Sequence, residues 1–368
     1  MPRALPLFLV TLLCGAVSLS AQNNMLFLEM SYPHYAEAVR LGGQYVAVGR
    51  GAAAAHVNSA ALAFQPEVQV LFSSGRSAPF PGVEYDMASD VVVSAPIPGW
   101  NTTVGVGYLI DDFTTSFKSY DDGLYVYDIR NTRLSVHTAT ALLEGLALGL
   151  AAHRYDSRIR PSWRSDYEAT ADAWDASLSV HARMTASFIG RERDELRFGL
   201  TFDNIFASDI RYIDEAQAEP IHQVFRLGAS YFWNPRYDRV WDLDPFAALL
   251  TLEGSLHGRD HEYRTWSQYG IGGEIRLFEI LMLSAGWENL EWQAYSYNDP
   301  GLPALRWGFG LDLPLHRLWS GGMPVHLQLD FARTEWYADT DNAYEWRYSD
   351  RSSVDDPVWS LQLRAPLY

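Results

Sequence analysis

The densest cluster of residues that could do chemistry is His257-Gly258-Arg259-Asp260-His261-Glu262. Imidazole nitrogens and carboxylate oxygens are ligands that bind zinc ions in proteins. Metalloenzymes often carry such histidines on one face of a helix, and no helical pattern surrounds this stretch. Because an arginine also lies inside it, we expect a solvated outward loop and no metal site.

Nucleophilic catalysis has no candidate residues either. The sequence lacks a Gly-x-Ser-x-Gly elbow, and its histidines show no recognisable spacing to a serine or aspartate partner. We therefore predict that the protein is not an enzyme and needs no cofactor.

The informative charged residues are those that alternate with apolar ones along extended stretches. They are Asp175, Arg183, Arg197, Asp203, Arg226, Glu274, Arg276, Arg306, Asp312 and Asp330. A buried charge must be paired or hydrated. If the strands form a barrel, this set faces the lumen, either as an ion-pair lattice that fills it or as a polar permeation path.

The elements that must position these residues are strands of period two. Leu196, Phe198, Leu200 and Phe202, for example, alternate with polar residues or glycine. The pattern predicts an all-β, transmembrane antiparallel barrel of about 14 strands, with short inner turns and long polar outer loops. A soluble β-sandwich is the alternative, but the strands are too many and no linker divides them.

The fourteen expected strands are residues 67–74, 85–95, 102–118, 124–141, 145–155, 172–185, 195–206, 222–233, 246–256, 268–277, 279–288, 304–313, 324–334 and 358–367.

The N-terminus has the form of a secretory signal peptide, residues 1–21. Met1-Pro2-Arg3 is basic, Leu5 to Val17 is apolar, and cleavage is expected after Ala21. The apolar run is shorter than the ~20 residues of a spanning helix. A lipoprotein signal at Cys14, the single cysteine, is disfavoured because no small residue directly precedes it. We expect export to the bacterial outer membrane, whose lipid surrounds the barrel.

The charge of the chain excludes one class of partner. The sequence holds 28 Lys and Arg against 45 Asp and Glu, a net charge of −17. Sequence-independent binding of nucleic acid depends on positive charge, so we expect no nucleic-acid partner.

Between the signal and the strands lies a segment of very small side chains, Gly49 to Phe64. Small residues fit a crowded barrel interior where larger ones would clash. We therefore divide the mature chain into a plug, residues 22–65, and a barrel, residues 66–368. The residues expected to form and shape the plug are Gly42, Gly43, Asn58, Ser59, Ala60 and Leu62.

Two stretches carry a family resemblance. Tyr35 to Val48, followed by Asn58-Ser59-Ala60-Ala61-Leu62, resembles the N-terminal segment of FadL-like outer-membrane proteins, especially their PorV and PorQ branch. Ser59 stands where that family has proline, so the turn is less rigidly set.

The resemblance implies passive uptake of hydrophobic small molecules, such as long-chain fatty acids, past a plug and through a lateral gap in the wall. Pro96, at the end of the second expected strand, suggests a kink for such a gap. The alternative is a PorV-like protein of type IX secretion that binds secreted protein domains through acidic, aromatic loops such as Glu335–Pro357.

Overall fold

The computed structural model describes twelve stretches of the chain: residues 35–75, 84–118, 124–161, 168–185, 194–210, 219–235, 243–257, 265–294, 297–298, 302–315, 324–336 and 356–367. The predicted signal peptide lies outside these residues and stays a prediction. Among the described residues, no helix combines the length and the apolar character needed to cross a bilayer.

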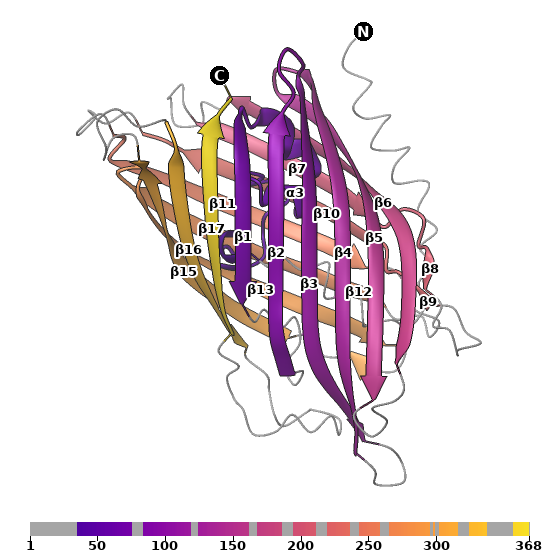
Figure 1. Cartoon of the computed structure of the whole chain (residues 1–368). Helices are drawn as coiled ribbons and strands as arrows, with labels where there is room; N and C mark the ends of the chain where they lie inside the picture. Colours follow the sequence, from indigo (N-terminus) through magenta and orange to yellow (C-terminus); the bar gives the residue numbers. More distant parts are fainter. Residues whose placement is uncertain are drawn as a thin grey trace.

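Fourteen antiparallel strands form one closed barrel (Figure 1). They are β1 (Glu67–Gly75), β2 (Glu84–Pro96), β3 (Thr102–Lys118), β4 (Leu124–Leu143), β5 (Leu146–Pro161), β6 (Ala169–Thr185), β7 (Glu195–Asp203), β10 (Val224–Trp233), β11 (Phe246–His257), β12 (Thr265–Leu277), β13 (Leu281–Ala294), β15 (Leu302–Pro314), β16 (His326–Trp336) and β17 (Asp356–Pro366).

Each strand pairs with its neighbour along the chain, and β1 pairs with β17 to close the ring. Three two-residue strands, β8 (Asp209–Ile210), β9 (Glu219–Pro220) and β14 (Tyr297–Asn298), lie in the connections. The predicted fold class, a barrel of about fourteen strands, is confirmed.

The two ends of the barrel differ. The links 97–101, 144–145 and 278–280 are short and lie at the end where β1 begins and β17 finishes, uppermost in Figure 1. We call this the short-turn end and the opposite one, where β16 ends at Trp336 and β17 begins at Asp356, the long-loop end.

Alternation along the strands separates an apolar outside from a polar inside. On β6, Trp174 is 59% exposed and the next residue, Asp175, is 4% exposed. Val106, Leu150 and Leu252 are likewise about half exposed on other strands. An isolated outer face of this composition would be insoluble, whereas a bilayer solvates it.

The N-terminal segment lies inside the ring of strands (Figure 1). Its elements are α2 (Ala36–Val39), α3 (Ala54–Val57) and the 3-10 helix η3 (Ser59–Phe64). Most of its small apolar side chains are fully buried, and several pack on inward residues of the wall such as Leu71, Val92 and Leu249. We refer to described residues 35–66 as the plug.

Inward-facing glycines of the wall let the plug backbone come close. A Cβ atom at Gly272 would overlap the carbonyl oxygen of Leu41, and one at Gly199 would overlap that of Val46. The glycines on the inner faces are therefore required by the plug, because any side chain there would displace it.

The short junction between β12 and β13 is confirmed: β12 ends at Leu277, and a turn over residues 278–280 follows, with Phe278 and Glu279 at positive φ. Two local expectations were wrong. Pro96 produces no kink, because it is the last residue of β2 and pairs in register with Thr103. β5 runs to Pro161, six residues further than expected, because pairing with β4 continues after the apolar alternation ends.

We expect Gly272→Ala to loosen the plug and the adjacent Gly273→Ala to leave it unchanged. Overpacking costs about 1–3 kcal/mol, whereas a Cβ at Gly273 would have no atom nearer than 3.8 Å. The measurement is the rate of tryptic cleavage after Arg50 in the folded, detergent-solubilised protein, since that bond is accessible only when the plug opens. Equal rates for the two variants would contradict this account.

Candidate functional site: the contact between plug and wall

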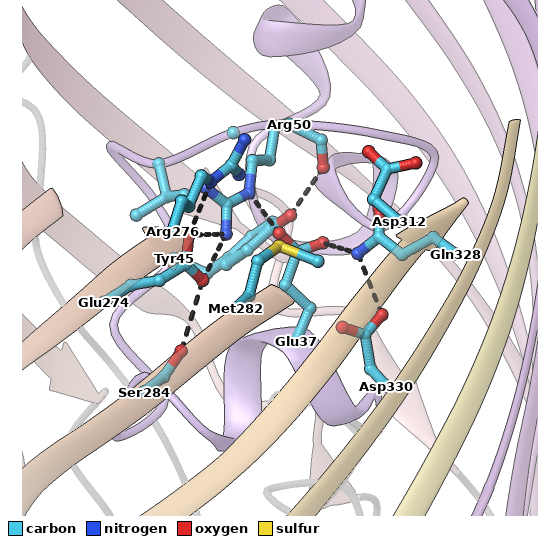
Figure 2. Close-up of polar contacts among 12 residues, drawn as sticks. Glu37, Tyr45, Arg50, Glu274, Arg276, Met282, Ser284, Asp312, Gln328 and Asp330 are labelled. Carbon is cyan, nitrogen blue, oxygen red and sulfur yellow. Dashed lines mark hydrogen bonds and ion pairs between the residues drawn. The ribbon is translucent and has the colours of Figure 1, made fainter. Parts of the chain in front are cut away.

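Glu274 of β12 is the centre of the polar contact between plug and wall (Figure 2). Its carboxylate accepts hydrogen bonds from Arg50 Nη2 at 2.7 and 2.8 Å and forms an ion pair with Arg40. Arg276 of the same strand donates its Nε at 2.8 Å. The Glu274 and Arg40 side chains are completely buried, so three guanidinium groups surround one desolvated carboxylate.

A second group of charges extends this contact toward β16. Glu37 forms an ion pair with Arg50 and lies 3.9 Å from Arg40. Asp330 Oδ1 lies 3.3 Å from Arg40 Nη2, and Gln328 donates its Nε2 to Asp330 at 2.8 Å. Three carboxylates therefore face three arginines. We call these six residues the anchor network: Glu37, Arg40, Arg50, Glu274, Arg276 and Asp330.

The plug carboxylate of this network is ionised at neutral pH. Burial raises the pKa of Glu37, but the charges of Arg50 and Arg40 outweigh burial and leave its pKa below the ordinary value. The buried charges thus neutralise one another across the boundary between plug and wall.

Wall side chains bind backbone groups of the plug that its internal turns and short helices leave without a partner. Glu253 accepts the N–H groups of Tyr45 and Val46 at 2.7 and 2.8 Å. Arg197 Nη1 donates to the Val48 carbonyl at 3.0 Å. Buried backbone groups must find such partners. Further contacts of this kind are Thr201 to Val57 and Ser230 to Ala47.

The residues expected to shape the plug lie at its turns and at its contact with β6. Gly42 and Gly43 have φ of 75° and 76°, a region that favours glycine. Asn58 donates its Nδ2 to the carbonyls of Val46 and Val180 at 2.7 and 3.1 Å.

The next three residues continue into η3. The Ser59 hydroxyl lies 2.9 Å from that of Ser179, which also accepts the Ala60 N–H. Leu62 is fully buried in the plug core. Ser59 is thus held to the wall by its side chain.

The ten expected lumen residues divide into separate groups. Glu274, Arg276 and Asp330 meet in the anchor network, and Arg197 binds the plug backbone. Four of the others form ion pairs outside that network: Asp203 with Arg226 at 2.8 Å, Arg306 with Glu288, and Asp312 with Arg364. Asp175 accepts the N–H groups of Phe206 and Ser208. Arg183 stacks on the ring of Phe64.

His257 does not lie in a solvated loop, contrary to expectation. It is the last residue of β11, only 1% exposed, and its Nε2 lies 3.0 Å from Ser255 Oγ. His261 lies outside the described residues. Within the described part of the chain, no group of three or more histidine, cysteine or acidic residues is arranged to hold a metal ion.

Sequence reasoning missed the plug half of the anchor network. Glu37 lies in the short helix α2, Arg40 directly follows that helix, and Arg50 follows a run of apolar residues. These three charges lie within a segment of otherwise small and apolar residues. Because a buried charge requires a partner, they could have indicated ion pairs between the plug and the wall.

Apolar side chains lie in the lumen on both sides of the plug. Toward the long-loop end, Leu109, Tyr155 and Ile221 form a buried cluster with Ala171 and Ala173. At the short-turn end, a cavity of about 710 Å³ lies between the end of η3 and the turns 97–101 and 144–145, and its lining mixes apolar residues with polar ones such as Asn101 and Glu144. We call these the apolar cluster and the short-turn cavity.

Fold and site together define a transmembrane β-barrel whose lumen is occupied by an N-terminal plug bound to the wall through buried ion pairs. No protein-family model matches the sequence, and neither does any curated protein.

Solved structures share the fold at low sequence identity. The CymD monoaromatic hydrocarbon channel aligns with a TM-score of 0.54 at 12% identity, over 91% of this chain and 97% of that one. The toluene transporter TodX of Pseudomonas putida aligns with a TM-score of 0.52 at 10% identity, over 91% and 98%. A FadL homologue of Pseudomonas aeruginosa gives 0.51 at 10% identity, over 91% and 98%.

We expect Glu274→Gln to release the plug. Removing one partner of a buried ion pair leaves uncompensated charge and costs about 3–5 kcal/mol, so tryptic cleavage after Arg50 should accelerate a hundredfold or more. The matched control is Asp112→Asn, which breaks an ion pair with Arg130, whose side chain is 59% exposed; such a pair contributes about 0–1 kcal/mol. An unchanged cleavage rate in Glu274→Gln would refute the anchoring role.

Glu37 should make stability depend on pH. Because its pKa is lowered in the folded protein, its contribution is complete above the pKa of an unfolded glutamate, about 4.3, and is lost as the pH falls through the folded value. We expect wild type to lose more thermal stability between pH 7 and pH 3 than Glu37→Gln does. Equal losses in the two proteins would show that Glu37 is not held by the arginines.

Proposed function

We infer that the protein is an outer-membrane channel for passive uptake of hydrophobic small molecules, related to the FadL-like proteins. The observation that carries this proposal is that apolar side chains line part of the otherwise polar lumen on each side of the plug, whose contacts with the wall are side-chain contacts. The plug would then separate the entry from the exit.

The entry on this proposal is the apolar cluster around Leu109 and Ile221, nearer the long loops. The exit is the short-turn cavity, whose apolar lining residues include Ile97, Trp100 and Leu142. A neutral hydrophobic molecule gains free energy from both surfaces and none from the anchor network. Movement of the plug, rather than a gap at Pro96, would connect them.

The fold likeness to a monoaromatic hydrocarbon channel and a toluene transporter supports small hydrophobic molecules as the class. Long-chain fatty acids are the further class that the sequence resemblance suggests. The PorV-like alternative depends on loops such as 337–355, outside the described residues; co-purification of a secreted protein with the barrel would test it.

The proposal is tested by uptake of radiolabelled toluene and oleate in a Gram-negative host that lacks its own channels for such molecules. We expect the protein to raise the initial rate several-fold over an empty vector, with no effect on labelled sucrose. Leu109→Asn, which puts an amide into the apolar cluster, should reduce the rate, while Leu109→Met, of similar size and polarity, should preserve it. Rates equal to those of the vector would exclude uptake of both classes.

A further inference from the structure

One buried carboxylate of the lumen has no partner among the described residues. Asp111 of β3 is completely buried, and neither of its oxygens has a hydrogen-bond partner in that part of the protein. Other inward carboxylates differ: Asp90 Oδ1 lies 2.9 Å from His56 Nε2, and Asp203 Oδ2 lies 2.8 Å from Arg226 Nη1. A buried carboxylate without a partner costs free energy, which a cationic ligand would recover.

The neighbouring strands supply no positive charge to Asp111. The residues that pair directly with it in the sheet are Ala88 of β2 and Asn131 of β4. The next inward residue of β4 is Arg133, which directs its Nη2 away from Asp111, to the plug residue His56, whose Nδ1 lies 3.0 Å away. This arginine belongs to the contact with the plug, and the charge of Asp111 is left uncompensated within the described part of the wall.

Asp111 lies between the plug and the long-loop end. Asp90, which contacts the plug, pairs with Leu109, and Asp111 follows two residues later on β3, about 7 Å nearer the long-loop end. On the outer face, the adjacent Asp112 forms an ion pair with Arg130, whose side chain is 59% exposed. Because the outer surface is charged at this height, Asp111 lies beyond the apolar belt that faces the lipid, near the outer mouth of the lumen.

The apolar cluster lies directly beside this carboxylate. Leu109 is the preceding inward residue of β3, and Ala171 of β6 belongs to the same row of paired residues as Asp111. Tyr155 and Ile221 complete the buried apolar surface. A negative charge and an apolar surface are therefore neighbours, and a ligand that has a cationic group and an apolar body can contact both.

The charge of the whole chain also favours a cation at this mouth. The sequence has 28 Lys and Arg against 45 Asp and Glu, a net charge of −17. A charge of this sign raises the local concentration of cations and lowers that of anions. This observation is independent of the contacts of Asp111, and it indicates a ligand of the same sign.

We propose that the outer part of the lumen binds protonated primary amines that carry a small apolar body. The ammonium group lies against the Asp111 carboxylate, and the apolar body lies against Leu109, Tyr155 and Ile221. A primary ammonium group has three N–H donors and can satisfy both carboxylate oxygens, whereas a quaternary ammonium group has none. The proposal rests on the proposed function for the position of the entry, and it adds cationic ligands to the neutral ones.

The test is isothermal titration calorimetry on the full-length protein in a non-ionic detergent at neutral pH. The probes are 2-phenylethylamine, its neutral analogue 2-phenylethanol, and trimethyl(2-phenylethyl)ammonium. We expect the primary amine to bind about ten times more tightly than the other two, because hydrogen bonds between charged groups contribute more than neutral ones. Equal affinities for amine and alcohol, or tighter binding of the quaternary compound, would overturn the proposal. Uptake of toluene is measured separately, so that result would leave the proposed function standing.

Two variants locate the binding. Asp111→Asn keeps the size of the side chain and removes its charge, so the preference for the amine over the alcohol should disappear. The matched control is Asp112→Asn, which makes the same change at the adjacent residue on the outer face and should keep the preference. Any other pattern in the two variants would contradict the assignment to Asp111.

Thermal unfolding of the same samples gives a second measure. Asp111→Asn replaces an uncompensated buried charge with a neutral amide, so it should unfold at the wild-type temperature or above. A ligand that binds only the folded protein raises its unfolding temperature. Saturating 2-phenylethylamine should therefore stabilise wild type and leave Asp111→Asn unchanged, and equal stabilisation of the two proteins would place the amine elsewhere.

Discussion

The ion pairs of Glu274 with the plug arginines are the interaction on which the rest of the interior depends. Arg40 and Glu274 are 234 residues apart in the sequence, and both are buried from solvent. Both charges need partners there, because an isolated buried charge costs several kcal/mol, and each binds groups from the other side of the boundary between plug and wall. The plug is therefore held at a defined depth and orientation, which a purely apolar contact would not fix.

This constraint determines the shape of the inner wall. With the plug fixed by charge on β12 and β16, its backbone passes so close to β7 and to β12 that only glycine is tolerated at Gly199 and Gly272. Glu253, Arg197 and Thr201 then supply the hydrogen bonds that an irregular segment lacks. The plug thus packs on apolar residues of the wall and is also attached to it through polar side chains.

Much of the fold could be predicted from the sequence, and the pairing of charges could not. The alternation on β6 indicates which residues face inward, since a strand has a period of two. It does not give the depth of a side chain relative to the plug, so Asp175, which binds a loop, and Glu274, which binds the plug, look alike in the sequence. Pairing of β5 with β4 also continues where Arg158 and Arg160 end the apolar alternation, so that boundary was missed.

The most direct test of a movable plug is a reversible covalent lock. The single cysteine of the sequence is Cys14, within the predicted signal peptide, and the hydroxyls of Ser59 and Ser179 lie 2.9 Å apart. A Ser59→Cys, Ser179→Cys protein can therefore form one disulfide between plug and wall. Uptake of labelled toluene by cells carrying this protein should stop on oxidation and return on reduction, with the single variant Ser179→Cys unaffected. Equal uptake in the oxidised and reduced states would show that cargo does not pass by displacement of the plug.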